Sequence, residues 1–186
     1  GIEHERIHLE TSSVLIRQHQ LKYVQKHPAW EPCHDSGVAP SNTLVDIPAA
    51  ELRLGRERSD PKIYGWDNEF GRHDASTAAF QASRYLVSNR EFLAFVEAGG
   101  YADDSLWLDE GAGWKKFTKA EHPTFWIKDG DQWRLRLMLE EVAMPWDWPV
   151  ETNYHEAKAF CNWKSRASGQ AVRLPTENEW QALRQF

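Results

Sequence analysis

The stretch NYHEAKAFCNWKSRASGQAVRLPTENEWQAL (Asn153–Leu183) carries the clearest signals of the fold. It opens with Asn153, and Glu156 follows three residues later. In this arrangement, a capping box, each side chain accepts a hydrogen bond from the backbone N–H of the other residue at the start of a helix. Glycine often ends helices because it adopts the left-handed backbone conformation without strain. The stretch therefore predicts a helix that begins at Asn153 and ends at Gly169.

Two more capping boxes predict two more helices. Thr176 is followed three residues later by Glu179, which predicts a helix near the end of the sequence. Ser88 and Glu91 have the same spacing, and the helix that they start is expected to end at Gly99.

Strands and long loops are expected between these helices. In Gln132–Leu137 apolar and polar residues alternate, which is the period of a strand with one buried face. Phe80–Val87 is a weaker strand candidate, and Tyr101–Asp131 is expected to be a long loop that carries several of the chain's 10 tryptophans. Short strands, long loops and capped helices together predict a mixed α+β fold.

The composition excludes several classes of function. The chain has 186 residues, 41% of them hydrophobic, which is enough for one substantial core. Its formal net charge of −6 argues against a nucleic-acid partner, because such proteins usually present a basic face. No run approaches the roughly 20 apolar residues of a membrane-spanning helix. With only two cysteines, Cys33 and Cys161, a reducing, cytoplasmic location is expected.

The pattern changes along the chain in a way that predicts three segments. Residues 1–18 have a helical period that places His4 and His8 on one face. Residues 19–48 contain four prolines and no sustained period, so we expect an irregular linker. Residues 49–186 form the α+β region. Because the sequence begins and ends within helical patterns, we expect a fragment that is truncated at both ends.

The sharpest chemical signal is the sequence HERIHLE, which runs from His4 to Glu10. Residues four apart on a helix are one turn apart along the axis and about 40° apart around it, so both imidazoles can reach one metal ion. Neutral imidazole is a ligand for iron, zinc or copper. Glu10 lies about 240° around the helix from His4, so we expect it to orient a ligand histidine from a neighbouring element or to pack the helix. A third ligand has to come from elsewhere.

Two other interpretations of the histidine pair remain open at this point. His4 and His8 could be hydrogen-bonded surface residues without a metal. Alternatively, Glu5 completes the pattern HExxH of zinc hydrolases, in which the glutamate is a general base. A zinc hydrolase would need its third ligand downstream, where no candidate stands out.

Three segments together resemble the formylglycine-generating-enzyme (sulfatase-modifying factor) family. They are YGWDNEFGRH (Tyr64–His73), YLVSNREFLAFVEAGGY (Tyr85–Tyr101) and the closing stretch Asn153–Leu183. The resemblance implies that residues 49–186 form the N-terminal part of a C-type-lectin-like mixed α/β domain, which is expected to continue past Phe186.

The motif YGWDNE combined with an upstream HxxxHxE helix is similar to the iron-dependent sulfoxide synthases within this superfamily. These enzymes join a DinB-like four-helix bundle, which supplies three iron-binding histidines, to the lectin-like domain. The resemblance implies that residues 1–18 are the last helix of such a bundle. It further implies that His4 and His8 are two Fe(II) ligands and that Glu10 is the acidic position of the motif. Glu5 would then be no catalytic base.

The resemblance also implies the reaction. Sulfoxide synthases use oxygen to join a cysteine sulfur to the imidazole ring of histidine and to oxidise the sulfur, so cysteine, histidine and oxygen are the expected small-molecule partners. The family's catalytic tyrosine is expected beyond Phe186, so no catalytic residue is assigned. Four tyrosines of this chain are expected in the core, namely Tyr64, Tyr85, Tyr101 and Tyr154.

Two branches of these enzymes differ in the acceptor. Those of ovothiol biosynthesis, the 5-histidylcysteine sulfoxide synthases, use free histidine, and the ergothioneine type uses trimethylhistidine. Ile7 stands where ergothioneine-type enzymes often have glutamine, which favours the ovothiol branch. An alternative from another class is a non-catalytic, lectin-like binding module.

Two further candidate sites are weaker. Cys161 lies at an apolar-facing helix position, and a buried structural thiol is expected there instead of a copper ligand. Asp67 and Glu69 are oxygen ligands that could bind calcium, although their spacing alone is weak support.

Overall fold

The computed structural model describes residues 1–59 and 64–186, and these residues form two compact units. The first unit consists of Gly1–Pro40 and Val87–Val172, and the second of Ser41–Leu86 and Arg173–Phe186. The first unit contains the following helices and strands: α1 (Ile2–Gln18), η1 (Leu21–Tyr23), α2 (Asn89–Glu97), η3 (Asp104–Leu106), α3 (Asp109–Thr118), β5 (Trp126–Asp129), β6 (Gln132–Arg136), β7 (Glu141–Ala143) and α4 (Tyr154–Ser168).

An antiparallel sheet in the order β5-β6-β7 and an aromatic core organise the first unit. In the register of this sheet, Leu135 of β6 lies between Trp126 and Val142. Phe92 of α2 stacks on Phe160 of α4 with ring centroids 5.3 Å apart, and Phe95 is fully buried beside them. Burial of these large rings stabilises the unit, because each aromatic side chain removes 150–250 Å² from water.

The second unit is built from two antiparallel strand pairs, β1-β4 and β2-β3, and a C-terminal helix that contacts β2 and β3. The first pair aligns Ile47 with Phe80. Its elements are β1 (Leu44–Ile47), β2 (Ala50–Leu54), η2 (Asp67–Glu69), β3 (His73–Thr77), β4 (Phe80–Ser83) and α5 (Glu177–Gln185).

The structure confirms the mixed α and β character and all three capped helices. Asn153 and Thr176 each form the complete reciprocal capping box, and Gly169 ends α4 in the left-handed conformation with φ of 69°. Ser88 forms half of the box, since its hydroxyl accepts the Glu91 N–H. The helix predicted for residues 1–18 is present as α1. Its assignment to a DinB-like bundle, and the segment boundaries at residues 18 and 48, stay predictions.

Two predictions of irregular structure were wrong. The expected loop Tyr101–Asp131 contains helix α3, which was missed because its N-cap residue is Leu108 and no side chain caps it. The expected linker 19–48 contains strand β1, whose partner β4 lies far along the sequence. The strand candidate Phe80–Val87 ends at Ser83. Within the described residues, no helix is long and apolar enough to cross a membrane.

Candidate functional site

The two predicted metal ligands meet on one face of α1. The Nε2 atoms of His4 and His8 are 2.8 Å apart, and the ring planes are inclined by 79° with centroids 4.5 Å apart. Both side chains are exposed. One ring therefore donates a hydrogen bond to the other, which requires at least one neutral imidazole.

This geometry fits a single metal ion. Imidazole nitrogens bind first-row metals at about 2.1 Å, so two ligands at right angles stand about 3 Å apart. The observed separation of the two Nε2 atoms is 2.8 Å, and the pair can thus bind one ion with little movement of α1. No group of three or more His, Cys, Asp or Glu residues suited to a metal occurs among residues 1–59 and 64–186. The pair accordingly supplies two ligands, and its role as an iron site stays a prediction.

Glu10 lies on the opposite face of α1 from both histidines. It follows His8 by two positions, which is about 200° around the helix, and it is exposed. Its backbone carbonyl accepts a hydrogen bond of 2.7 Å from the Ser13 hydroxyl. From this position the Glu10 carboxylate can orient a ligand only if that ligand comes from a neighbouring element.

The expectation that the tyrosines lie in the core holds only for Tyr101, which is 7% exposed. Tyr64, Tyr85 and Tyr154 are 60%, 48% and 61% exposed, so for these three residues the prediction was wrong. Tyr64 and Tyr85 lie outside helices and strands, and Tyr154 is the first residue of α4. Aromatic content alone does not distinguish a core position from such element ends.

Tyr101 forms a buried polar contact in the first unit. Its Oη donates a hydrogen bond of 2.6 Å to Glu156 Oε1, and Glu156 is 2% exposed. Burial raises the pKa of Glu156, against the opposing effect of the hydrogen bonds from Tyr101 and the Asn153 backbone. Burial and the Glu156 charge also raise the pKa of Tyr101 far above its ordinary value. The phenol therefore keeps its proton and acts as a structural donor, not as a base.

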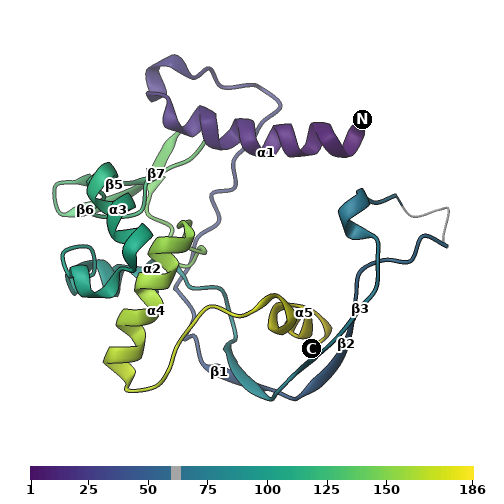
Figure 1. Cartoon of the computed structure of the whole chain (residues 1–186). Coiled ribbons are helices and arrows are strands. Elements are labelled where there is room, and N and C mark those ends of the chain that lie inside the picture. Colours follow the sequence, from purple (N-terminus) through teal and green to yellow (C-terminus); the bar gives the residue numbers. More distant parts are fainter. Residues whose placement is uncertain (60–63) are drawn as a thin grey trace. The chain divides into compact units, whose positions relative to one another are not determined.

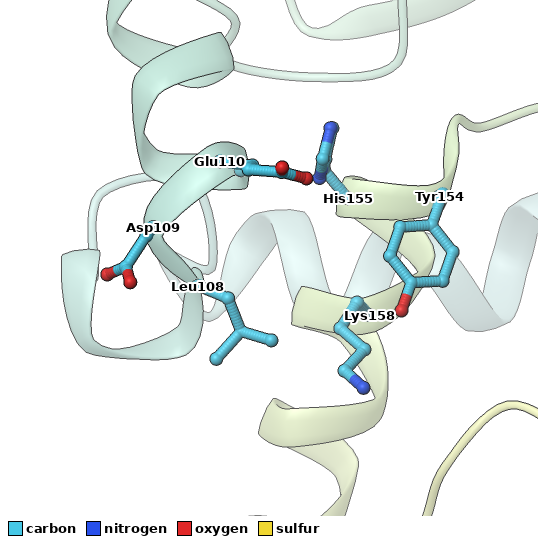
Figure 2. Close-up of a pocket in the computed structure, with 7 residues that line it drawn as sticks. Leu108, Asp109, Glu110, Tyr154, His155 and Lys158 are labelled. Carbon is cyan, nitrogen blue, oxygen red and sulfur yellow. The ribbon is translucent and has the colours of Figure 1, made fainter.

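A surface hollow of about 340 Å³ lies between α3 and α4, apart from the histidine pair. Figure 2 shows the Glu110 side chain of α3 directed toward His155 of α4, whereas Asp109 points away. Every ionisable side chain in its lining is at least partly exposed, so none has the desolvated environment typical of a catalytic acid or base. The lining residues are Leu108, Asp109, Glu110, Gly111, Tyr154, His155 and Lys158.

The remaining candidates have local environments that explain them without a ligand. Cys161 is buried as predicted, and burial raises the pKa of its thiol, whereas Cys33 is exposed. Glu69 accepts a 2.8 Å hydrogen bond from the Trp66 backbone N–H, and Asp67 faces solvent. These contacts give no support to a calcium site.

Comparison with known proteins finds a family domain, and it finds relatives whose alignments cover different shares of this chain. The sulfatase-modifying factor enzyme 1-like domain matches residues 33–184. Hercynine oxygenase of Mycolicibacterium thermoresistibile is 32% identical over 97% of this chain and 38% of the relative. Hercynine oxygenase of Mycolicibacterium smegmatis is 30% identical over 97% of this chain and 40% of the relative. Formylglycine-generating enzyme of Thermomonospora curvata is 29% identical over 74% of this chain and 47% of the relative.

The chain thus spans about two fifths of the length of the hercynine oxygenases that it matches. The family match covers most of the sequence and includes α2, α3, α4 and most of α5. This chain belongs to the sulfatase-modifying factor enzyme 1-like domain family.

Proposed function

We propose that this chain is part of a non-haem iron, oxygen-dependent sulfoxide synthase that joins a cysteine sulfur to a histidine imidazole ring. The observation that carries the proposal is the His4–His8 pair, with Nε2 atoms 2.8 Å apart on a helix that precedes the family domain. The whole protein's reaction is a four-electron oxidation. Loss of the thiol and ring hydrogens forms the C–S bond, one oxygen atom enters the sulfoxide, and the other leaves as water.

The pattern of relatives supports this proposal over a formylglycine-generating enzyme. The hercynine oxygenases align with 97% of this chain, so their match has to include most of α1. The formylglycine-generating enzyme of Thermomonospora curvata aligns with 74%. Of these three relatives, the two hercynine oxygenases are the ones whose alignments are long enough that most of α1 has to be included.

The residues of this chain fit the requirements of such a site. His4 and His8 present imidazole nitrogens from one helix face, and both side chains are exposed to solvent, where substrates have access. An iron(II) ion bound there would supply redox chemistry with oxygen and would lower the pKa of a bound thiol. Ile7 lies between the ligands and is 50% exposed, so it offers an apolar surface beside them. In this proposal Glu10 would orient a ligand from a neighbouring element.

We propose free histidine as the acceptor, which is the substrate of the ovothiol branch. The support for this choice is Ile7, since an apolar side chain next to the ligands cannot hydrogen-bond an imidazole substrate as glutamine can. A second candidate is hercynine, which is trimethylhistidine, because the relatives at 32% and 30% identity are named hercynine oxygenases.

A competition experiment tests the proposal. The full-length protein, loaded anaerobically with ferrous iron, is given ¹⁸O₂, cysteine, γ-glutamylcysteine, histidine and trimethylhistidine together, and products are weighed by mass spectrometry. The proposal predicts a cysteine–histidine conjugate that contains one ¹⁸O atom. A trimethylhistidine conjugate would support the second candidate. Absence of any conjugate while iron is bound would contradict the proposal and favour a non-catalytic, lectin-like binding module.

A further inference from the structure

The helix that carries the histidine pair has little apolar contact with the rest of its unit. None of the 17 residues of α1 is buried, and its large apolar side chains are mostly exposed. In Figure 1, α1 meets the sheet of β5, β6 and β7 only near its C-terminal end and extends away from it toward the N-terminus. Within the described residues, the contacts that set the direction of α1 relative to this sheet therefore lie in its last turn.

Arg17 makes most of these contacts. Its two terminal nitrogens donate to the two carboxylate oxygens of Glu151, each at 2.7 Å, and its Nε donates to the Arg136 carbonyl at 2.9 Å. The guanidinium also lies over the Phe125 ring, 3.7 Å from its centroid. The Arg17 side chain is only 10% exposed. A planar guanidinium bound on both edges and one face has a fixed orientation, which lysine cannot reproduce.

Arg136, a residue of the sheet, contacts the C-terminal end of the same helix. This residue of β6 is 5% exposed, and its Nη2 donates to the carbonyl of His19, the residue that caps α1. Its Nη1 donates to the Leu137 carbonyl at 2.7 Å. Burial lowers the pKa of Arg136, and the neighbouring Arg17 charge acts in the same direction. Two cations at a helix C-terminus interact favourably with the helix dipole, and the Glu151 carboxylate offsets part of their mutual repulsion.

From these contacts we propose that Arg17 is a positioning residue for the His4–His8 pair. The inference rests on the proposed function, because it concerns the placement of the iron ligands. His8 and His4 precede Arg17 by nine and 13 residues, which is about 14 Å and about 20 Å along the helix axis. A tilt of about 10° at Arg17 would move the two histidines by roughly 2 to 3 Å relative to the sheet. Displacements of about 1 Å between reacting groups can slow catalysis by roughly a hundredfold.

The same geometry predicts that the Arg17 contacts affect where the histidine pair lies but not its ability to bind a metal ion. The spacing of the two histidines is set inside α1 by the helix itself, so loss of the Arg17 contacts leaves the pair intact. What changes is the direction of the helix relative to the rest of the first unit. Arg17 variants therefore retain iron but turn over slowly, and oxygen consumption loses its coupling to sulfoxide formation.

The test compares Arg17→Gln, Arg17→Lys and Glu151→Gln with the matched control Arg6→Gln in the full-length, iron-loaded protein. Arg6 lies on the same helix, and its ion pair among the described residues is a local one with Glu3, at 3.0 Å. We expect all variants to bind iron as the unaltered protein does. We expect kcat and the yield of sulfoxide per oxygen to fall at least tenfold in Arg17→Gln, with partial recovery in Arg17→Lys and no loss in Arg6→Gln. The double variant Arg17→Gln/Glu151→Gln should be no worse than Arg17→Gln alone.

A distance measurement tests positioning independently of turnover. Cu²⁺ bound at the histidine pair and a nitroxide on Ala167→Cys, at the exposed end of α4, give a distance distribution by pulsed electron paramagnetic resonance, in a Cys33→Ser background. We expect a narrow distribution in the parent and in Arg6→Gln, and a broadened or shifted one in Arg17→Gln. An unchanged distribution, or full turnover in Arg17→Gln, would overturn the inference. If the parent forms no conjugate at all, the proposed function fails, and the distance distribution alone decides whether Arg17 sets the direction of α1.

Discussion

Tyr101 donates a 2.6 Å hydrogen bond to the carboxylate of Glu156, and the same carboxylate accepts the Asn153 backbone N–H at 2.9 Å. Glu156 thus caps α4 with one oxygen and fixes the turn after α2 with the other. The Tyr101 ring lies 5.3 Å from that of Trp107, and therefore the contact joins the aromatic core to the start of a helix. This pair explains how a charged residue is accommodated in the interior of the first unit.

Tyr101→Phe should lower the free energy of unfolding by about 1 to 3 kcal/mol, because it removes a hydrogen bond to a buried carboxylate. The matched control is Tyr154→Phe, whose hydroxyl lies on a side chain that is 61% exposed and which should change stability by less than about 0.5 kcal/mol. Urea denaturation followed by tryptophan fluorescence measures both. Equal stability of the two variants would show that the Tyr101 hydroxyl contributes nothing.

Glu156 should make the stability of the first unit depend on pH. Because burial raises its pKa in the folded state, the folded protein holds the proton more tightly than the unfolded chain does. The stability contributed by this group is fully present below its ordinary pKa of 4.5 and is lost as the pH rises through the higher folded value. The denaturation midpoint of the parent, measured relative to that of Glu156→Gln, should therefore fall as the pH rises from about 4 to 7. A difference that is constant over this range would contradict the raised pKa.

Two glycines of α3 offer a direct test of packing. A Cβ at Gly111 would lie 3.2 Å from the His155 Cβ, whereas a Cβ at Gly113 would have no heavy atom within 4 Å. Gly113→Ala should stabilise the protein by up to about 1 kcal/mol, because alanine favours the helix. Gly111→Ala has the same higher helix preference, but crowding of the new methyl group against α4 offsets the stabilisation. Thermal unfolding should rank Gly113→Ala above Gly111→Ala, and the reverse order would disprove the close approach of α3 to α4.

The two cysteines should differ sharply in reactivity. The Cys161 thiol is buried and its pKa is raised by burial, so little thiolate is available, whereas Cys33 is exposed. Iodoacetamide under native conditions should modify Cys33 at least tenfold faster than Cys161, as measured by mass spectrometry of digested samples. Rapid modification of both would indicate that α4 is not packed as the structure shows.

Local signals in the sequence predicted local structure well. The helices α4 and α5 follow from reciprocal capping boxes at Asn153 and Thr176, and both boxes are present in the structure. The close approach of His4 and His8 follows from helix geometry alone and is confirmed at 2.8 Å. In each case the interacting residues are three or four positions apart.

What the sequence could not reveal depends on contacts between distant residues. Arg17 and Glu151 are 134 positions apart, and neither belongs to a motif, so no sequence signal connects them. Helix α3 contains Gly111 and Gly113 and lacks a side-chain cap, so local preference argues against it, and packing against α4 stabilises it instead. The burial of Tyr101 likewise follows from its tertiary partner Glu156.

The most direct test of the central claim combines the histidine variants with product analysis in the full-length protein. His4→Ala and His8→Ala are compared with Arg6→Gln, each reconstituted with ferrous iron and supplied with oxygen, cysteine and histidine or trimethylhistidine. We predict that each histidine variant loses bound iron and forms at least a hundredfold less sulfoxide conjugate, while Arg6→Gln behaves as the parent. Conjugate formation at the parental rate in His4→Ala or His8→Ala would contradict the claim that this pair holds the catalytic metal.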